Sequence, residues 1–207
     1  MARRQSKAKQ QEELVKGVIG LAAIVPGGAG WVLSGSIQVG FIAAGVGIAV
    51  AIALLINMAI SRNERLKRSG IGEIDEMDGV RFEQYLGHLF RSQGYKAEVT
   101  QAQGDYGADL VLTKGNNRIV VQAKRYKKNV GLKAVQEVQS AKAHYRANEA
   151  WVVTNSNCTE QAKKLASSNR VRLIARDELI EMLLQMKARS AAGNRNSGER
   201  KTGKTSA

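Results

Sequence analysis

The sequence is poor in the residues that cross-link a chain or bind metals. Its 207 residues include one cysteine, Cys158, and two histidines, His88 and His144. A single cysteine excludes an intramolecular disulfide, which fits a folded part that is exposed to the cytosol. Neither histidine has a carboxylate or a second histidine at metal-ligand spacing, so we interpret both as ordinary helix residues.

Acidic residues are also scarce. The chain has 18 Asp and Glu against 32 Lys and Arg, which gives a formal net charge of +14. This excess favours polyanionic partners, either nucleic acid or an anionic membrane surface, and says nothing about the fold. The length is enough for one medium domain and some additional segments.

No charged residue of either sign occurs from Gly17 to Ile60. A spanning helix needs roughly 20 apolar residues, so we predict two membrane spans, at about 16–34 and 37–60. Pro26 weakens the first span, although membrane helices tolerate proline. A cleaved signal peptide fits less well, because one apolar stretch runs directly into the next. One long or re-entrant helix with a kink at Pro26 is the other alternative.

Basic residues flank the apolar run on both sides. The segment 1–15 is a basic N-terminus, and 61–76 is a charged linker. By the positive-inside rule, both flanks face the cytoplasm. We therefore expect a multi-pass protein of a bacterial inner membrane, with both termini and the folded domain in the cytoplasm. Small residues of the second span, such as Gly40 and Ala44, favour packing of the hairpin on itself, with self-association as the alternative.

Residues 77–187 alternate between helical and strand patterns, which predicts one α/β domain. The order is αβββαβαβα, with elements expected at 79–93, 95–102, 109–113, 118–124, 131–147, 151–153, 158–168, 171–174 and 177–187. Residues 188–207 lack apolar periodicity and are predicted to be a disordered basic tail.

A stretch in this tail, 198–205, fits the phosphate-binding pattern G-x-x-x-x-G-K-[ST]. A working phosphate-binding loop lies between a buried strand and a helix, and no strand pattern precedes this one. We therefore expect no bound nucleotide. Contact of a basic tail with DNA or lipid headgroups is the preferred interpretation.

Three polar side chains converge on the predicted hairpin. Asp109 opens its first strand, and Gln122 and Lys124 share one face of its second strand because side chains alternate along a strand. Val121 and Ala123 take the other face. The hairpin thus brings together one carboxylate, one amide oxygen and one ammonium group. Spacing alone leaves open two ordinary strands with polar ends.

The pattern G-D-Y-G-A-D-L followed by V-V-Q-A-K-R-Y resembles the Mrr-like restriction endonuclease domain of the PD-(D/E)xK nuclease superfamily, in its D…QxK variant. The resemblance extends from about Met77 to about Leu184. It implies a restriction-endonuclease-like core, in which helices flank a mixed β-sheet, here preceded by a transmembrane helical hairpin.

The resemblance also implies a type IV restriction enzyme that uses Mg²⁺, with Mn²⁺ as a substitute, to hydrolyse phosphodiester bonds in DNA. Asp109 would be the main metal ligand, and Gln122 and Ala123 would add carbonyl oxygens. Lys124 would help to deprotonate the attacking water. Glu83, on the first helix of the domain, would complete the metal site. The catalytic group would thus comprise Asp109, Gln122, Lys124 and Glu83.

Several basic side chains directly follow this group: Arg125, Lys127, Lys128 and Lys133. They would hold flanking DNA phosphates in a salt-dependent manner, or they form a solubilising loop. The expected partners are DNA, the lipid bilayer and, if double-strand cutting needs two sites, a second copy in a homodimer. Because Gln122 removes one negative charge, a weak or inactive membrane-tethered DNA-binding module is the alternative. A protein-binding scaffold is a third.

Overall fold

The computed structural model describes residues 7–100 and 106–202, with side chains described over 12–100 and 106–192. The chain divides into two compact units between Glu64 and Arg65.

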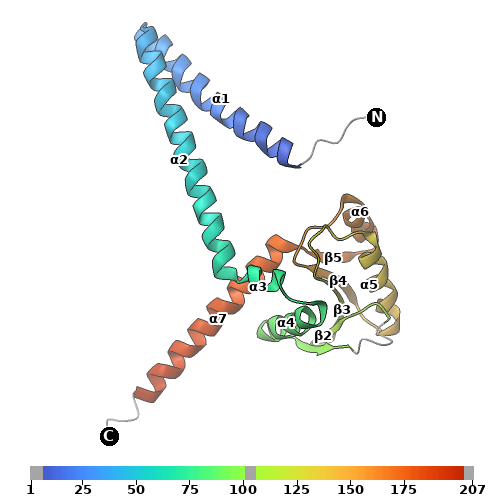
Figure 1. The fold of residues 1–207 in the computed structure, drawn as a ribbon. Helices are drawn as coiled ribbons and strands as arrows, with labels where there is room; N and C mark the ends of the chain where they lie inside the picture. Colours follow the sequence, from blue (N-terminus) through green and yellow to red (C-terminus); the bar gives the residue numbers. More distant parts are fainter. Residues whose placement is uncertain (1–6, 101–105, 203–207) are drawn as a thin grey trace. The chain divides into compact units, whose positions relative to one another are not determined.

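The first unit is a helical hairpin (Figure 1). Helix α1 (Lys7–Ser34) and helix α2 (Ile37–Ser69) meet at Gly35, whose positive φ of 64° makes the turn. This turn lies between the two predicted spans. Both helices extend beyond the predicted spans because the charged flanks contain good helix formers, including Glu, Lys, Arg and Gln.

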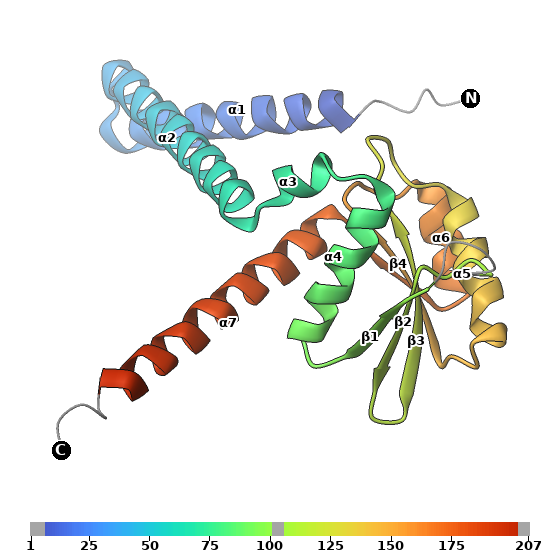
Figure 2. The same cartoon turned by 60° about the horizontal axis from the view of Figure 1, so that its bottom comes forward.

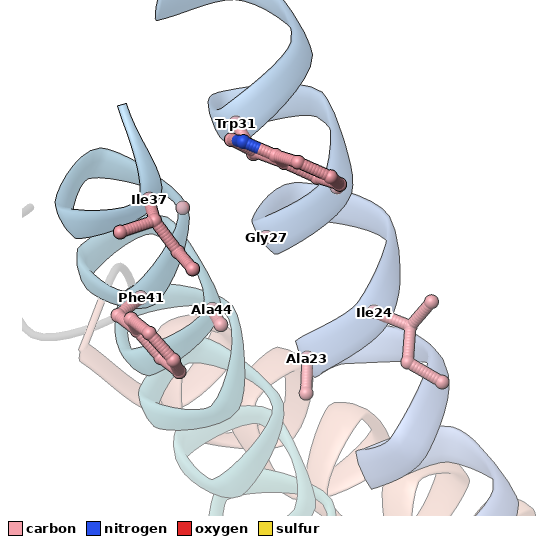
Figure 3. A pocket seen from close by; sticks show the side chains of 9 residues that line it. Ala23, Ile24, Gly27, Trp31, Ile37, Phe41 and Ala44 are labelled. Atoms are coloured by element: carbon pink, nitrogen blue, oxygen red, sulfur yellow. The ribbon is translucent and has the colours of Figure 1, made fainter. Parts of the chain in front are cut away.

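Small residues let α1 and α2 approach closely. A Cβ atom added at Gly27 would lie 3.1 Å from the Cβ of Ala44, and one added at Gly47 would overlap the carbonyl oxygen of Ala22. Figure 3 shows Ala23 and Gly27 of α1 on the side that faces Ala44 of α2. The small residues of the second helix thus pack against the first.

The second unit is a five-stranded sheet with helices on both faces (Figure 2). The strand order is β1-β2-β3-β4-β5; β1 to β3 are antiparallel and β3 to β5 are parallel. This mixed sheet and the predicted order of elements are confirmed. In chain order the elements are α3 (Ile71–Asp75), α4 (Gly79–Ser92), β1 (Lys96–Val99), β2 (Leu110–Lys114), β3 (Asn117–Lys124), α5 (Leu132–His144), β4 (Glu149–Thr154), α6 (Glu160–Ser168), β5 (Val171–Ile174) and α7 (Arg176–Thr202).

Alternation along β3 divides the core into two clusters. Val121 and Ala123 face the layer of α4 and α7, where Phe82 and Leu86 are fully buried. Val120 faces the layer of α5 and α6. Gln122 and Lys124, in phase with Val120, therefore lie on the α5 side of the sheet.

The sequence placed the end of the linker too late. Gly70, with a φ of 76°, ends α2, and α3 follows directly. Ile71 and Ile74 are 2% and 1% exposed and belong to the core of the second unit. Two isoleucines three residues apart give one apolar face, so this part of the predicted linker 61–76 is a buried helix of the domain.

The C-terminal end also differs from the prediction. Helix α7 continues to Thr202, whereas disorder was predicted from Ala188. The lack of apolar residues prevents burial but not helix formation, since the Ala, Arg, Glu and Lys residues of this segment favour helices. The described part of the phosphate-loop-like stretch continues this helix, and residues 203–207 lie outside the described range, as do residues 1–6 of the basic N-terminus.

Strand β1 ends at Val99, and the last two residues of the predicted strand, 101–102, lie outside the described residues. Thr100 turns its backbone N–H to the carbonyl of Asp109 at 2.9 Å, and its hydroxyl donates to the carbonyl of Ala108 at 2.6 Å. The main-chain bond continues the register of β1 on β2 by one residue. Residues 101–105, which include Gly104 and Asp105 of the motif, lie outside the described residues.

The close packing of α1 on α2 gives a direct test. A Gly27→Cys and Ala44→Cys pair in a Cys158→Ser background should form a disulfide, because the Cβ atoms lie near the spacing that a disulfide needs. Adding Gly47→Leu should slow this cross-linking strongly, because the new side chain pushes the helices apart. The rate is measured by gel shift of the full chain in detergent.

Gly45→Leu is the matched control, because a Cβ atom at Gly45 meets nothing within 4 Å. Equal cross-linking rates for the Gly47 and Gly45 variants would contradict the packing described here.

Candidate active site

Asp109 is held at the start of β2 by its main chain. Its N–H donates to the carbonyl of Val121 at 2.8 Å, and its carbonyl accepts from Thr100. The residue is only 8% exposed. A carboxyl group at this depth requires hydrogen-bond donors, because burial without them is costly.

The neighbouring strand supplies those donors. The Oδ2 atom of Asp109 accepts from the side-chain nitrogen of Gln122 at 2.5 Å and from the main-chain N–H of Ala123 at 2.6 Å. An ionised carboxylate only accepts hydrogen bonds, so the amide nitrogen of Gln122 has to face it. Among the residues that the structure describes, the Oε1 atom of Gln122 then has no hydrogen-bond partner, although it is buried. A buried acceptor without a partner costs about 1–3 kcal/mol, so this oxygen is ready for a ligand.

Lys124 is paired with an acid that the sequence analysis missed. Its Nζ atom lies 3.1 Å from Glu137 Oε2 of α5, at ion-pair distance but without the alignment of a hydrogen bond. Lys133, one turn earlier on α5, lies 3.8 Å from the other oxygen of Glu137. The sequence did carry a signal, because Glu137 is the one acidic residue of α5. Its approach to Lys124 depends on how α5 packs on the sheet.

The loop before Asp109 lies directly against α5. A Cβ atom added at Gly107 would lie 2.5 Å from the carbonyl oxygen of Glu137, and Gly107 has a φ of 89°. The preceding residue, Tyr106, stacks on His144 of α5 with ring centroids 3.8 Å apart. His144 is thus part of an aromatic contact. Gly107 is required here because only a residue without a side chain fits this approach.

The other predicted site residues are more dispersed. Glu83 is half-buried on α4, on the opposite side of the sheet from α5. Lys127 and Lys128 are exposed, and Arg125 is half-buried and points toward the main-chain carbonyl of Asp75 at 3.4 Å. Arg125 therefore contacts the protein interior in this structure, whereas the two lysines face solvent.

Asp75 joins four segments at the edge where β3 and β4 end. Its carboxylate accepts two hydrogen bonds from Arg176, at 2.8 and 2.7 Å, and one from Asn155, at 2.7 Å. Asn155 in turn accepts from the main-chain N–H of Tyr126 at 2.8 Å. Burial by itself would raise the pKa of Asp75. The hydrogen bonds from Arg176 and Asn155, with the charges of Arg176 and Arg125, outweigh burial and lower that pKa below its usual value.

The oxygen atoms at the end of the hairpin suit a hard divalent cation. Asp109 offers a carboxylate, and Gln122 offers the unpartnered Oε1 atom. Within the described ranges, no three His, Cys, Asp or Glu side chains come together in a metal-binding group. The donor set therefore fits Mg²⁺, which binds through a few protein oxygens and keeps several waters. It does not fit a structural zinc site.

The second unit matches the sequence model of a known protein family. The sequence model of a family described as restriction endonuclease, Mrr_cat, matches residues 74–183. No curated protein matches the chain.

Three solved structures resemble part of the chain. A protein of unknown function, AF1548, is 22% identical with a TM-score of 0.46, over 54% of this chain and 67% of that one. The DNA modification-dependent restriction endonuclease AspBHI is 20% identical with a TM-score of 0.47, over 59% of this chain and 35% of that one. MspJI restriction endonuclease in complex with a 27-mer oligonucleotide is 20% identical with a TM-score of 0.42, over 56% of this chain and 30% of that one. The match thus spans about a third of the AspBHI and MspJI chains.

The close approach of Gly107 to α5 predicts that adding one methyl group at this position lowers the stability of the fold. Gly107→Ala should destabilise the chain by more than the ~1–2 kcal/mol that a left-handed conformation costs an L-residue, because the methyl group also overlaps the Glu137 carbonyl. The measurement is the thermal midpoint of the full chain in detergent. Gly115→Ala is the control, since Gly115 has a positive φ but open space. Equal losses for both variants would contradict a required close approach.

The Asp75 network predicts a pH-dependent stability. Because the pKa of Asp75 is lower in the folded chain, its stabilisation is fully present above the unfolded value of about 3.9 and is lost as the pH falls through the folded value. Asp75→Asn should therefore cost about 1.5–3 kcal/mol at pH 7, and the difference from the parent should shrink below about pH 4.

Thermal midpoints of the full chain at several pH values measure this difference. Asp78→Asn is the matched control, because Asn caps the start of α4 as well as Asp does. A deficit of Asp75→Asn that is the same at pH 3 and pH 7 would rule out the charge of Asp75 as its cause.

Proposed function

The chain belongs to the Mrr_cat family of restriction endonucleases, and from this premise we propose that it is a membrane-anchored, Mg²⁺-dependent DNA endonuclease of restriction type IV. The reaction is hydrolysis of a phosphodiester bond at the end of the hairpin formed by β2 and β3. One observation carries the proposal. Asp109 and Gln122 are hydrogen-bonded to each other in a buried position, and Gln122 keeps a buried carbonyl oxygen without a partner.

The metal would be held by Asp109, by the side-chain oxygen of Gln122 and by the main-chain carbonyl of Ala123. When bound, Mg²⁺ polarises the phosphate and makes water a better nucleophile at neutral pH, and Mn²⁺ substitutes for it. Glu83 is the proposed further acid of the site. It lies on α4, across the sheet from α5.

Protein side chains stabilise the transition state and hold the catalytic lysine in position. Lys124 directs its ammonium group to the scissile phosphate, where it stabilises the negative charge of the transition state and orients the attacking water. Glu137 holds Lys124 in position by the ion pair at 3.1 Å. Thr154 fixes the end of β3, because its hydroxyl donates to the carbonyl of Lys124 at 2.6 Å. Glu137 is thus a positioning residue.

Exposed basic groups beside the site provide the contact with DNA. Lys127 and Lys128 are exposed on the loop after β3, and the side chain of Lys133 is 87% exposed. Such contacts release counterions from DNA, so binding should weaken steeply with salt. Arg125 contributes by holding the loop against Asp75 or, when released, by binding phosphate itself.

The proposed anchor is the helical hairpin of the first unit. Residues 12–34 of α1 and helix α2 are long and apolar enough to cross a bilayer by length and composition. Val32, Leu33 and Phe41 are 79%, 87% and 72% exposed, which a helix in the core of a soluble protein would not show. With basic flanks on both sides, the proposed location is the bacterial inner membrane with the nuclease domain in the cytoplasm. Double-strand cutting would use two such chains as a homodimer.

One observation favours a second candidate, a membrane-tethered module that binds DNA without cutting it. Gln122 already satisfies Asp109 with its amide nitrogen, and it adds no negative charge of its own. A site with one fewer carboxylate binds a divalent cation more weakly than an all-acid site.

Cleavage by the full chain in detergent distinguishes the two candidates. The purified protein is incubated with methylated and unmethylated plasmid DNA in Mg²⁺ or Mn²⁺, and nicked and linear products are measured on gels. Asp109→Ala and Lys124→Ala should each lower the rate roughly 10²–10⁴-fold, because each removes a group that acts on the transition state.

Asp177→Asn on α7 and Lys163→Ala on α6 are surface controls that should cut at the parental rate. Cleavage by Asp109→Ala at the control rate would refute the assigned site. Salt-sensitive DNA binding without cleavage in either metal would support the non-cutting module instead.

A further inference from the structure

A second candidate binding site lies beside the proposed catalytic group. The loops that follow β3 and β4 border a cavity of about 360 Å³, whose lining residues include Tyr126, Lys127, Ser156 and Asn157 from these loops and Asp75, Glu76, Asn155 and Arg176. This volume is at the small end of the range for ligand pockets. It suits one small planar group and excludes a duplex.

The wall formed by Tyr126 is half exposed and held in place. The residue is 50% exposed, and its main-chain N–H donates to the side-chain oxygen of Asn155 at 2.8 Å. Asn155 itself is 3% exposed and donates to Asp75. The ring is therefore carried by a loop whose backbone is fixed by buried hydrogen bonds. Such a ring offers a stacking surface with little loss of conformational freedom on binding.

The side chains of Asp75 and Arg176, which line the cavity, already make hydrogen bonds within the protein. Arg176 makes a two-pronged ion pair with Asp75 and also donates to the carbonyl of Asn155 at 2.7 Å. These groups therefore shape the cavity and have few hydrogen bonds left for a ligand. By contrast, the amide of Asn157 and the hydroxyl of Ser156 make no side-chain hydrogen bond within the described part of the chain. They remain able to bind a polar edge.

The position of Tyr126 close to Lys124 in the sequence indicates which ligand could reach the cavity. Tyr126 follows Lys124 by two residues, which span at most roughly 7 Å. The exposed Lys127 and Lys128 come next. An aromatic ring beside a row of basic groups is the combination by which proteins bind single-stranded nucleic acid, where bases stack on rings and lysines hold phosphates.

We propose that this cavity takes one unstacked nucleobase from a nucleotide next to the scissile phosphate. Tyr126 stacks on the base, Asn157 hydrogen-bonds its edge, and Lys127 holds the adjoining phosphate. The preferred substrate is therefore DNA with an unpaired or flipped-out base beside the cut. This inference rests on the proposed nuclease function for its biological meaning, but the binding itself needs neither metal nor cleavage.

The test is binding of 2-aminopurine DNA to the full chain in detergent, at fixed salt and with a chelator. Two duplexes carry the fluorescent base, one paired and one in a single-nucleotide bulge. The parent should bind the bulged duplex more tightly and quench its fluorescence. Tyr126→Ala should abolish the quenching and weaken binding of the bulged duplex roughly 5- to 150-fold, while binding of the paired duplex changes little.

Three further variants separate stacking from other effects. Tyr126→Phe should keep the preference for the bulge, because it keeps the ring. Lys127→Ala should weaken binding of both duplexes alike and reduce the salt dependence, because it removes a phosphate contact. Tyr106→Ala removes a tyrosine that is 60% exposed on another segment, and it should leave the preference unchanged.

Equal binding of both duplexes by the parent, or an unchanged preference in Tyr126→Ala, would overturn the proposal. A preference that depends on Tyr126, in a chain that never cuts DNA, would support the cavity and refute only the nuclease function. Cleavage of DNA by the parent, with a preference for the bulge that does not depend on Tyr126, would support the nuclease function and refute the base-binding cavity.

Discussion

The carboxylate of Asp109 is buried, and it can be buried only because β3 presents two donors to it. The N–H of Ala123 and the side-chain amide of Gln122 both reach the same carboxylate oxygen. This requirement fixes how β2 enters the sheet and which face of β3 carries the polar side chains. A shift of β3 by one residue would turn Gln122 and Lys124 toward the apolar layer of α4 and α7. The register of the hairpin and the candidate site therefore depend on one set of hydrogen bonds.

The second support of the site is helix α5. Gly107 touches the backbone of α5 at Glu137, and the side chain of the same residue pairs with Lys124. The loop before Asp109 and the end of β3 are thus held against one turn of one helix. Within this arrangement the charges of Lys124 and Glu137 balance each other. Among the described residues, the buried oxygen of Gln122 has neither a hydrogen bond nor an ion pair, and a divalent cation would satisfy it.

Asp75 connects this region to the chain that comes from the helical hairpin. It lies at the end of α3, inside the segment 61–76 that was predicted to be a linker. Through Asn155 it fixes the backbone of Tyr126, and through Arg176 it fixes the start of α7. The position of the loop proposed to contact DNA therefore depends on α3, through the hydrogen bonds of Asp75.

The sequence by itself predicted the strands and helices between 79 and 187 and the identity of the central polar residues, although it missed α3 and the continuation of α7. Alternation along 118–124 placed Gln122 and Lys124 on one face, and the predicted hairpin brought Asp109 near them, because these are local properties of strands and hairpins. Only the tertiary structure decided that Glu137 pairs with Lys124, that Gly107 must lack a side chain, and that Arg125 turns toward Asp75. Those contacts join residues that are far apart in the chain, and their distances depend on how helices pack on the sheet. Local patterns carry no information about that packing.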